Sequence, residues 1–574
     1  MIAGVLSGTA GEIREATNAC RTHFLFAAIC TSFINLLLLA YPLFMMQVYG
    51  RVLESRSIET LVALGTGMIL ALSFRALFHW FSGRLLVRAS IRIDRLLSDR
   101  VLSAMLERNA ARPGEVGSQL LRDLDATRQF ATGRAATAPM EFPWIGLFLG
   151  LLFLVDPPLG VVALCCIVTI ALLVVANGLA TKRSIRAANR SALISYQFAE
   201  ANLRSADAIL SMGMMPGVLR RWHRARDDAL SAQAQASGRA VIFSAILASA
   251  RVGSQALILG CGAIRVIDAD LPLGIPFLGV ILFNYSMRPV EVVMGAWEAF
   301  QSAKESLRRL SALLAETPER AKSMKLPRPL GRLACRNLVW LPPAGDRAVI
   351  KGVSVTVEAG TSVGIFGPTG AGKTTLVRLI VGLLKPSSGS VRLDGAEVSG
   401  WDRDELSRHF GYLPQDVGLV AGSVADNIGR FGQFDESAIV DAATRAGAHA
   451  MILALERGYD TVIGEGGHAL SGGQRQLIGL ARAVVGSPSL VVLDEPNSNL
   501  DGPGENALLA CIQSLKSGRT TLVMVSHRPN LVQRLDQLAL LRDGAIVAMG
   551  PTPAIMQRIG RPIAVERAAD DEAG

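Results

Sequence analysis

Six long apolar stretches restrict the possible folds of this chain more than any other feature. They lie at about 24–48, 58–82, 138–156, 159–179, 240–264 and 273–297. A helix of about 20 apolar residues is long enough to cross the hydrocarbon core of a bilayer. Half of the 574 residues are apolar and the mean hydropathy is +0.36, which also favours a membrane protein. The first half is therefore predicted to be an α-helical domain with six transmembrane spans.

Two polar segments separate the second span from the third and the fourth span from the fifth. Residues 84–137 and 180–239 contain good helix formers, and their few Pro and Gly residues gather near 113–114 and 213–217. We expect helical arms that continue the spans by about 30 Å or more. A turn or a short crosswise helix is expected at the tip of each arm.

Positive charge predicts the orientation of these spans. Residues 84–137 hold ten Arg, and residues 180–239 hold nine Arg and one Lys. The short links between spans hold only Arg51, Arg56 and Arg265. By the positive-inside rule, the arms and both termini are cytoplasmic. The net charge of +10 is also compatible with a nucleic-acid partner. However, the basic residues lie beside apolar spans, so we expect no nucleic-acid partner and contact with membrane lipids instead.

Several ionisable side chains lie inside the predicted spans. They are Arg75, His79, Glu141, Arg251, Arg288 and Glu291. Charges in hydrocarbon are costly, so they face a polar translocation path, pair with one another or reach the membrane surface. Glu141, Arg288 and Glu291 lie close enough to span ends to reach the surface. Arg251 is therefore the best candidate for a charge that faces a cavity.

A glycine-rich turn dominates the second half of the chain. It consists of Gly367, Pro368, Thr369, Gly370, Ala371, Gly372, Lys373, Thr374 and Thr375. An apolar run at 362–366 precedes the turn, and a segment of helical character at 376–384 follows it. In such a strand–turn–helix unit, backbone N–H groups point at phosphate oxygens. Lys373 is expected to reach the β- and γ-phosphates of a nucleotide, and the Thr374 hydroxyl is expected to bind Mg²⁺.

Two carboxylates end a second apolar run at 490–493. Asp494 is placed to hold Mg²⁺ through water, and Glu495 to polarise the water that attacks the nucleotide. Gln415 supplies a neutral polar group on a loop and is a further candidate for the metal. His527 ends another apolar run and is expected to contact the γ-phosphate. Each of these motifs alone could have a purely structural role. Their order and spacing together indicate a site for nucleotide chemistry instead.

A second anion-binding turn lies between Gln415 and Asp494. It reads Leu470, Ser471, Gly472, Gly473 and Gln474, directly before a segment of helical character. Free backbone amides at a helix start bind anions. With this pentapeptide, residues 330–555 resemble the ATPase domain of ABC transporters. A Pro-rich segment at 316–330 reads as the boundary, so we expect a transmembrane domain over 1–319 and an α/β phosphate-loop ABC ATPase domain over 320–574.

The resemblance implies a specific arrangement of the ATP site. ATP lies between the phosphate loop of one copy and Ser471 to Gln474 of a second copy, with Glu495 as general base. Asp501 belongs to the turn at 498–501 that flanks this interface, where Asn499 replaces the usual Ala. One cassette and six spans imply a half-transporter that works as a homodimer. The arm tips near 117–126 and 208–218 would be the coupling helices that dock beside the Gln415 loop, and Glu465 would belong to the exporter-type loop that contacts them.

The segment that stacks on adenine departs from the family pattern. Residues 338–343 contain no Tyr, and Trp340 is the aromatic residue available to replace it. The membrane half resembles type I secretion ATPases in three places: residues 45–53, where Gly50 stands where Asp is common, residues 119–130, and residues 288–291. The order of segments is similar to the branch that exports proteases and lipases. Only about 23 residues precede the first span, so we expect no leader-cleaving peptidase domain.

This second resemblance implies the inner-membrane ATPase of a three-part secretion machine. Its partners would be a periplasmic adaptor, an outer-membrane channel and an unfolded substrate with a C-terminal secretion signal, such as an RTX-type protease or lipase. An ABC exporter or flippase of lipids or small molecules would share the fold and the ATPase motifs, so it stays an alternative. A non-transport ABC ATPase that acts on DNA or translation is a second alternative, against which the six spans argue.

Overall fold

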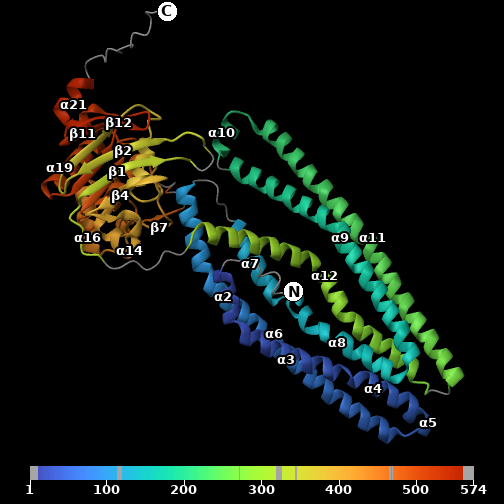
Figure 1. Cartoon of the computed structure of the whole chain (residues 1–574). Coiled ribbons are helices and arrows are strands. Elements are labelled where there is room, and N and C mark those ends of the chain that lie inside the picture. Colours follow the sequence, from blue (N-terminus) through green and yellow to red (C-terminus); the bar gives the residue numbers. More distant parts are fainter. Residues whose placement is uncertain are drawn as a thin grey trace, which may run out of the picture. The chain divides into compact units, whose positions relative to one another are not determined.

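The computed structural model describes residues 11–112, 119–203, 205–269, 272–318, 326–342, 345–464, 467 and 470–559. The chain forms two compact units, Met1–Pro318 and Glu319–Gly574 (Figure 1). The first unit is helical throughout its described part, and the second unit combines strands and helices. Each unit has its own buried apolar clusters.

Long helices build the first unit. In chain order they are α2 (Gly11–Ala19), α3 (Arg21–Leu38), α4 (Ala40–Gln47), the π-helix η1 (Val48–Val52), α5 (Leu53–Ser55), α6 (Ile58–Ala111), α7 (Gln119–Thr132), α8 (Arg134–Val155), α9 (Pro157–Leu203), α10 (Ala206–Ser211), α11 (Met215–Ala269) and α12 (Ile275–Glu316). All six predicted spans lie within these helices, apart from one or two residues at span ends or between consecutive helices. Among the described residues, four helices are long and apolar enough to cross a membrane: 21–55, 58–111, 157–181 and 215–268. The third predicted span contains the shorter apolar helix Met140–Val155, and the sixth lies in α12.

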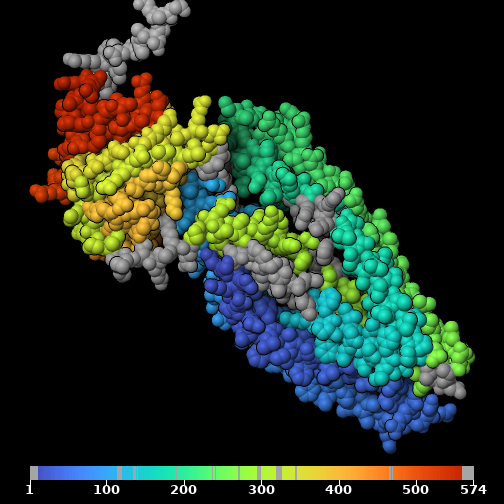
Figure 2. Space-filling model, in the orientation of Figure 1, coloured from blue at the N-terminus to red at the C-terminus, as the bar shows by residue number. Residues whose placement is uncertain are grey.

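Apolar side chains cover much of the outer surface of this unit. On α6, Ile69, Leu70 and Trp80 are 68%, 59% and 53% exposed, although helices in soluble proteins turn such residues inward. The helices α2, α3 and α6 pack along one another and form a continuous face, drawn in blue in Figure 2. An extended apolar surface of this kind suits contact with lipid chains.

The second arm has the predicted form. Helices α9 and α11 lie side by side along most of their length, and the short helix α10 connects them at the tip (Figure 1). Gly213 has a φ of +64°, a left-handed conformation that glycine adopts at little cost, and it lets the chain turn into α11. The expected crosswise helix of this arm is thus confirmed. The tip of the first arm, residues 113–118, lies outside the described residues.

Several ion pairs connect helices of this unit, and two of them involve α12 together with α11 or α7. Arg251 of α11 contacts Glu291 of α12, with 2.6 Å between Nη1 and Oε1. Both residues line a cavity of about 540 Å³ between α9, α11 and α12, so Arg251 faces a cavity and is also paired. Deeper in the unit, the carboxylate of Asp123 on α7 accepts two hydrogen bonds of 2.7 Å from Arg309 of α12. The Ser306 hydroxyl donates a third hydrogen bond to Asp123 at 2.9 Å.

Parallel strands form the centre of the second unit. The larger sheet has the order β12 (Ala545–Pro551), β11 (Gln537–Arg542), β3 (Ser362–Phe366), β10 (Thr521–Val525), β9 (Leu490–Asp494) and β6 (Phe410–Leu413). The four strands from β3 to β6 in this order are mutually parallel, and so is β11. Strands β9 and β10 are buried along their whole length, as expected for apolar strands that helices cover on both faces.

Smaller sheets and helices complete this unit. A second sheet has the order β2 (Ile350–Val357), β1 (Leu333–Trp340), β4 (Ser388–Leu393) and β5 (Ala396–Glu397), and β7 (Gly422–Ser423) pairs with β8 (Val462–Ile463). The helices are α13 (Lys373–Ile380), η2 (Val398–Gly400), α14 (Arg403–His409), α15 (Val424–Ile428), α16 (Glu436–Arg445), α17 (His449–Leu453), η3 (Gly458–Asp460), α18 (Gly472–Val484), α19 (Gly502–Ser517), α20 (Pro529–Val532) and α21 (Thr552–Ile559).

Helix α13 differs from its predicted extent. We expected helical structure over 376–384, but the helix begins at Lys373 and ends at Ile380. Gly382 has a φ of +69°, and the N–H of Leu383 bonds to the carbonyl of Arg378. This is a common way for a glycine to end a helix, and it explains why the apolar run continues beyond the last helical turn.

Candidate nucleotide site

Four predicted site segments meet at one edge of the larger sheet. The phosphate loop follows β3, His527 follows β10, Asp494 ends β9 and Gln415 follows β6. These four strands are parallel neighbours, so their carboxyl ends lie side by side. Ligands of parallel α/β sheets bind at this edge. The fold therefore brings together residues that lie up to 160 positions apart in the sequence.

The phosphate loop folds closely around its own lysine. The Nζ of Lys373 donates hydrogen bonds to the carbonyls of Gly367 and Pro368, each at 2.9 Å. Gly370 and Gly372 have φ values of +83° and +97°, which side-chain-bearing residues rarely adopt. A Cβ on Gly367 would lie 2.1 Å from the carbonyl oxygen of Leu541, so only glycine fits there. The loop is thus held in a tight curve with its cation at the centre.

Asp494 is the most unusual charged group of the site. Its side chain is fully buried, and among the described residues the nearby Thr374 hydroxyl is the one hydrogen-bonding group close to its carboxylate. Burial raises its pKa from 3.8 to about 6; the nearby Glu495 adds to this rise, and Thr374, Arg378 and Lys373 oppose it. A buried carboxylate with so few partners carries a large desolvation cost, which a cation would offset. The residues present therefore fit a divalent metal beside Thr374.

Glu495 has three close contacts at the end of β9. Its backbone N–H donates to the carbonyl of Val525 at 2.9 Å, and its φ of +47° is rare for a residue with a side chain. The Nε2 of Gln415 donates to Oε2 at 3.3 Å, and Nδ1 of His527 lies 3.5 Å from Oε1. The structure thus gathers the three predicted catalytic residues around one carboxylate. A backbone outlier of this kind is typical of a functional site.

The second anion-binding turn begins α18. Ser471 is the N-cap: its hydroxyl accepts a hydrogen bond from the N–H of Gln474, and Oε1 of Gln474 accepts one from the N–H of Ser471. Gly472 and Gly473 pack so closely on Asn499 that a Cβ would lie 3.4 Å and 3.1 Å from its atoms. In the described part of the chain, no hydrogen bond joins this turn to residues 367–375. The exposed helix start is therefore available to a ligand from outside the chain.

Two further predicted residues, Asp501 and Trp340, have local backbone contacts. Asp501 caps α19 by accepting a hydrogen bond from the N–H of Gly504 at 3.0 Å. Trp340 ends β1 and is half-buried, and its carbonyl accepts from the N–H of Val349. Glu465 lies outside the described residues. The roles of these residues in binding stay predictions.

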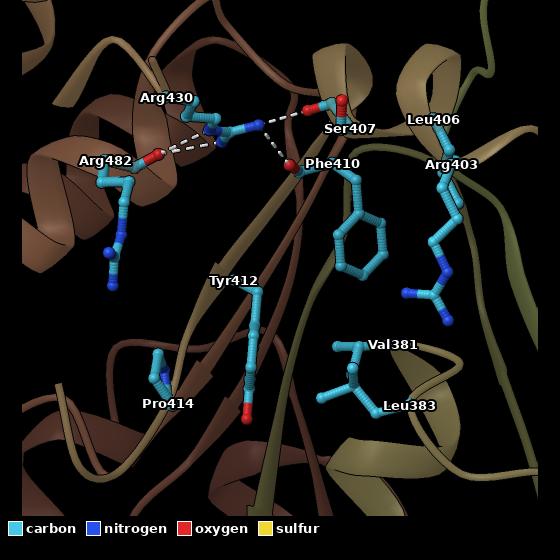
Figure 3. Close-up of a pocket in the computed structure, with 10 residues that line it drawn as sticks. All are labelled: Val381, Leu383, Arg403, Leu406, Ser407, Phe410, Tyr412, Pro414, Arg430 and Arg482. Carbon is cyan, nitrogen blue, oxygen red and sulfur yellow. Dashed lines mark hydrogen bonds between the residues drawn. The ribbon is translucent and has the colours of Figure 1, made fainter. Parts of the chain in front are cut away.

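A pocket beside the Gln415 loop contains a residue that the sequence did not single out. The pocket measures about 320 Å³ and lies between β6, α14 and the end of α13. Figure 3 shows Arg430 donating hydrogen bonds to the carbonyls of Arg482, Ser407 and Phe410. Burial, followed by the nearby Arg482, lowers the pKa of Arg430 to about 10. This arginine therefore fixes the start of β6, the strand that leads to Gln415.

Sequence comparisons place both units in one family. The family model of the ABC transporter transmembrane region matches residues 24–290, and the ABC transporter model matches residues 350–498. A bacterial Atm1-family ABC exporter with ATP bound superposes with a TM-score of 0.82 over 94% of this chain and 96% of that chain, at 19% identity. The predicted fold class is thereby confirmed. The membrane match also favours a transporter over a soluble ABC ATPase.

Several secretion proteins are similar along nearly the whole chain. The type I secretion system ATP-binding protein PrsD of Rhizobium meliloti (strain 1021) is 38% identical over 98% of this chain and 97% of its own length. The cyclolysin secretion/processing ATP-binding protein CyaB of Bordetella pertussis is 29% identical, over 96% of this chain and 78% of its own. The leukotoxin export ATP-binding protein LtxB of Aggregatibacter actinomycetemcomitans is 27% identical, over 92% and 76%. This chain belongs to the type I secretion ATP-binding proteins, an ABC transporter family whose members combine a transmembrane region with an ATPase domain.

Proposed function

We propose that this chain is the ATP-hydrolysing component of a type I secretion system. It exports an unfolded protein with a C-terminal secretion signal across the inner membrane. The similarity to PrsD over 98% of the chain is the observation that carries this proposal. The resemblance at residues 45–53 and 119–130 supports a type I secretion ATPase, and the order of segments is similar to the branch that exports proteases and lipases. An RTX-type protease or lipase is therefore the expected substrate.

The phosphate loop would hold ATP by its backbone N–H groups and by Lys373. In the present conformation Lys373 bonds to two loop carbonyls, which phosphate oxygens would replace as partners. Thr374, Asp494 and Gln415 would hold Mg²⁺, which supplies charge neutralisation for the β- and γ-phosphates when it is bound. The buried, unpaired carboxylate of Asp494 is the feature of this chain that fits a divalent cation best.

Hydrolysis would use the cluster around Glu495. Its carboxylate takes a proton from the attacking water, as a general base. Gln415 and His527 hold that carboxylate from two sides, at 3.3 Å and 3.5 Å. Because Gln415 is also a candidate metal ligand, its hydrogen bond to Glu495 joins the metal position to the base. Positioning of the water and neutralisation of charge are the main contributions of a protein to phosphoryl transfer.

Two copies would be needed to complete each site. Ser471, Gly472, Gly473 and Gln474 present a capped helix start to the outside of the chain, and a nucleotide held by a second copy is the expected ligand. Asp501 flanks the same surface, and Trp340 is the residue we expect to stack on adenine. We therefore expect a homodimer with two ATP sites, each built from both chains.

The membrane unit would span the inner membrane, with both termini and the ATPase unit in the cytoplasm. The Arg-rich arms support this orientation through the positive-inside rule. A periplasmic adaptor and an outer-membrane channel would continue the path, and membrane lipids would surround the exposed apolar helices. A second candidate function is export of lipids or small molecules. The aliphatic cavity with its Arg251–Glu291 pair favours it, because such a cavity suits an amphiphile.

Replacement of the proposed base tests the ATPase part of this account. Glu495→Gln should bind ATP with unchanged affinity and lose turnover by at least about a hundredfold, because the amide cannot accept the proton. The measurement is phosphate release by the full-length dimer in lipid, together with the amount of ATP retained after removal of free nucleotide. The wild-type chain with and without Mg²⁺ is the control. Undiminished turnover in Glu495→Gln would remove Glu495 from the role of base.

A further inference from the structure

We call residues 470–474 the signature turn, and α18, which begins there, the signature helix. A buried glutamine joins the signature helix to the turn that contains Glu495. Gln476 lies in the second turn of α18 and is 1% exposed. Its Nε2 donates a hydrogen bond of 2.9 Å to the carbonyl of Pro496. Pro496 directly follows Glu495 in the chain. The helix that begins at Ser471 is therefore connected to the backbone next to the proposed base.

The turn after β9 is held from two directions. From the side of β10, Val525 accepts a hydrogen bond from the N–H of Glu495, and the hydroxyl of Ser526 donates to Oδ1 of Asn497 at 3.3 Å. From the side of α18, Gln476 supplies its bond to Pro496. Glu495 keeps a left-handed φ of +47°, which persists only where neighbouring bonds fix the backbone. The position of the Glu495 carboxylate therefore depends on each of these bonds.

Gln476 carries a desolvation cost at this buried position. Its Oε1 is buried and has no hydrogen-bond partner among the described residues. An apolar side chain of similar volume would avoid the cost of a buried, unpaired carbonyl oxygen. The surrounding positions of α18 are in fact apolar, with Ile478, Leu480 and Val484 all buried. The donor of Gln476 thus has one acceptor, the carbonyl of Pro496, and ties α18 to the residue that follows Glu495.

We propose that Gln476 is a positioning residue that aligns Glu495 when the signature turn of the same chain is occupied. The proposal rests on the dimer described above, in which Ser471 contacts the nucleotide of the partner. Gln476 lies five residues from Ser471 on one helix, about 7.5 Å along its axis. Movement of the helix start onto the partner's nucleotide is therefore transmitted to Pro496 and to Glu495. Occupancy of one ATP site thus controls hydrolysis at the other.

The first test removes the donor and keeps the volume. Gln476→Leu in the full-length dimer in lipid should lower kcat about tenfold, the expected effect of one lost hydrogen bond of this kind. The KM for ATP should change less than twofold, because no nucleotide contact is lost. Thr520→Val is the matched control, since it removes a buried hydrogen bond to the carbonyl of Pro488 away from the site. The control should keep the wild-type kcat.

A mixed dimer shows whether a loss of turnover comes from misplacement of Glu495 or from damage to the signature turn. One chain of this dimer carries Glu495→Gln and the other keeps Glu495. In the site that can still hydrolyse ATP, the chain with Glu495 supplies the base and the Glu495→Gln chain supplies the signature turn. Adding Gln476→Leu to the chain with the intact Glu495 should lower turnover about tenfold. Adding it to the Glu495→Gln chain, whose α18 serves the active site only as signature, should leave turnover unchanged.

Equal losses in the two placements, or a loss only in the Glu495→Gln chain, would overturn the proposal. Gln476→Met, which keeps the length of the side chain without a donor, should show the same asymmetry and replaces Gln476→Leu if that variant does not fold. Full turnover in a dimer with Glu495→Gln in both chains would instead contradict the proposed base. The two ideas therefore fail in different experiments.

Discussion

Two buried aspartates, one in each unit, differ in the partners that the protein supplies for their charge. Asp123 of the membrane unit is 1% exposed and accepts hydrogen bonds from Arg309 and from Ser306. Asp494 of the ATPase unit is fully buried, and no ion pair and no hydrogen bond beyond a contact with the Thr374 hydroxyl balances its charge among the described residues. Burial costs a charge its hydration in both places, but only Asp123 regains the lost interactions within the chain. A satisfied buried charge holds structure, whereas an unsatisfied one points to a ligand.

The same substitution should therefore have opposite effects on stability at the two positions. Asp123→Asn weakens the hydrogen bonds to Arg309 and removes its counter-charge, and it should lower the free energy of unfolding by about 1–3 kcal/mol, because Asp123 is buried but water reaches Arg309, which is 36% exposed. Thermal unfolding of the full-length chain in lipid or detergent measures this loss. Glu291→Gln is the matched control, because the Arg251–Glu291 pair is more than one-third exposed and should contribute about 1 kcal/mol or less. Equal losses in the two variants would remove the distinction between the pairs.

Asp494→Asn should stabilise the chain in the absence of Mg²⁺. In the unfolded chain the carboxyl titrates near 3.8, but burial raises its pKa in the folded chain to about 6. The folded state therefore holds the extra proton between these values, and the free energy of unfolding falls as the pH rises from about 4 to about 6. At pH 7 the variant avoids this penalty of up to about 3 kcal/mol, whereas at pH 4 the two proteins should be nearly equal.

Mg²⁺ sharpens this comparison further. Mg²⁺ with ATP should raise the melting temperature of the wild-type chain more than that of Asp494→Asn, because binding to the folded state alone stabilises it. The variant should also lose ATP turnover. A wild-type melting temperature that does not change between pH 4 and pH 7, relative to the variant, would show that Asp494 has a further partner in the protein.

Local patterns were sufficient to predict which segments meet at the candidate nucleotide site. The phosphate loop, Asp494, Glu495 and His527 each follow an apolar strand, and parallel strands bring their carboxyl ends together. The apolar helices were equally predictable from length and hydropathy, and among the described residues four of them are long and apolar enough to cross a bilayer. The turn at the tip of the second arm followed from its glycines. Each of these features is determined by a short segment of sequence, so it can be predicted without knowledge of distant contacts.

Contacts between distant elements could not be predicted in this way. Asp123 and Arg309 lie 186 residues apart, and nothing in either segment indicates the other. Arg251 was expected to face a cavity, but its pairing with Glu291 was not foreseen, since Glu291 lies near a span end. Gln476 offered one signal: it lies four residues before Leu480 and eight before Val484, on the buried face of an amphipathic helix. A polar residue in such a stripe predicts a buried partner without naming it.

ATP hydrolysis by this chain should drive protein export, and one measurement tests this directly. The proteins in the culture medium are compared between the parent bacterium, a deletion of this chain, and the deletion complemented with the wild-type or the Glu495→Gln chain. We predict that an RTX-type protein disappears from the medium and accumulates in the cytosol in the deletion. Only the wild-type chain should restore its export. An unchanged set of medium proteins in the deletion, or full export by Glu495→Gln, would contradict the account.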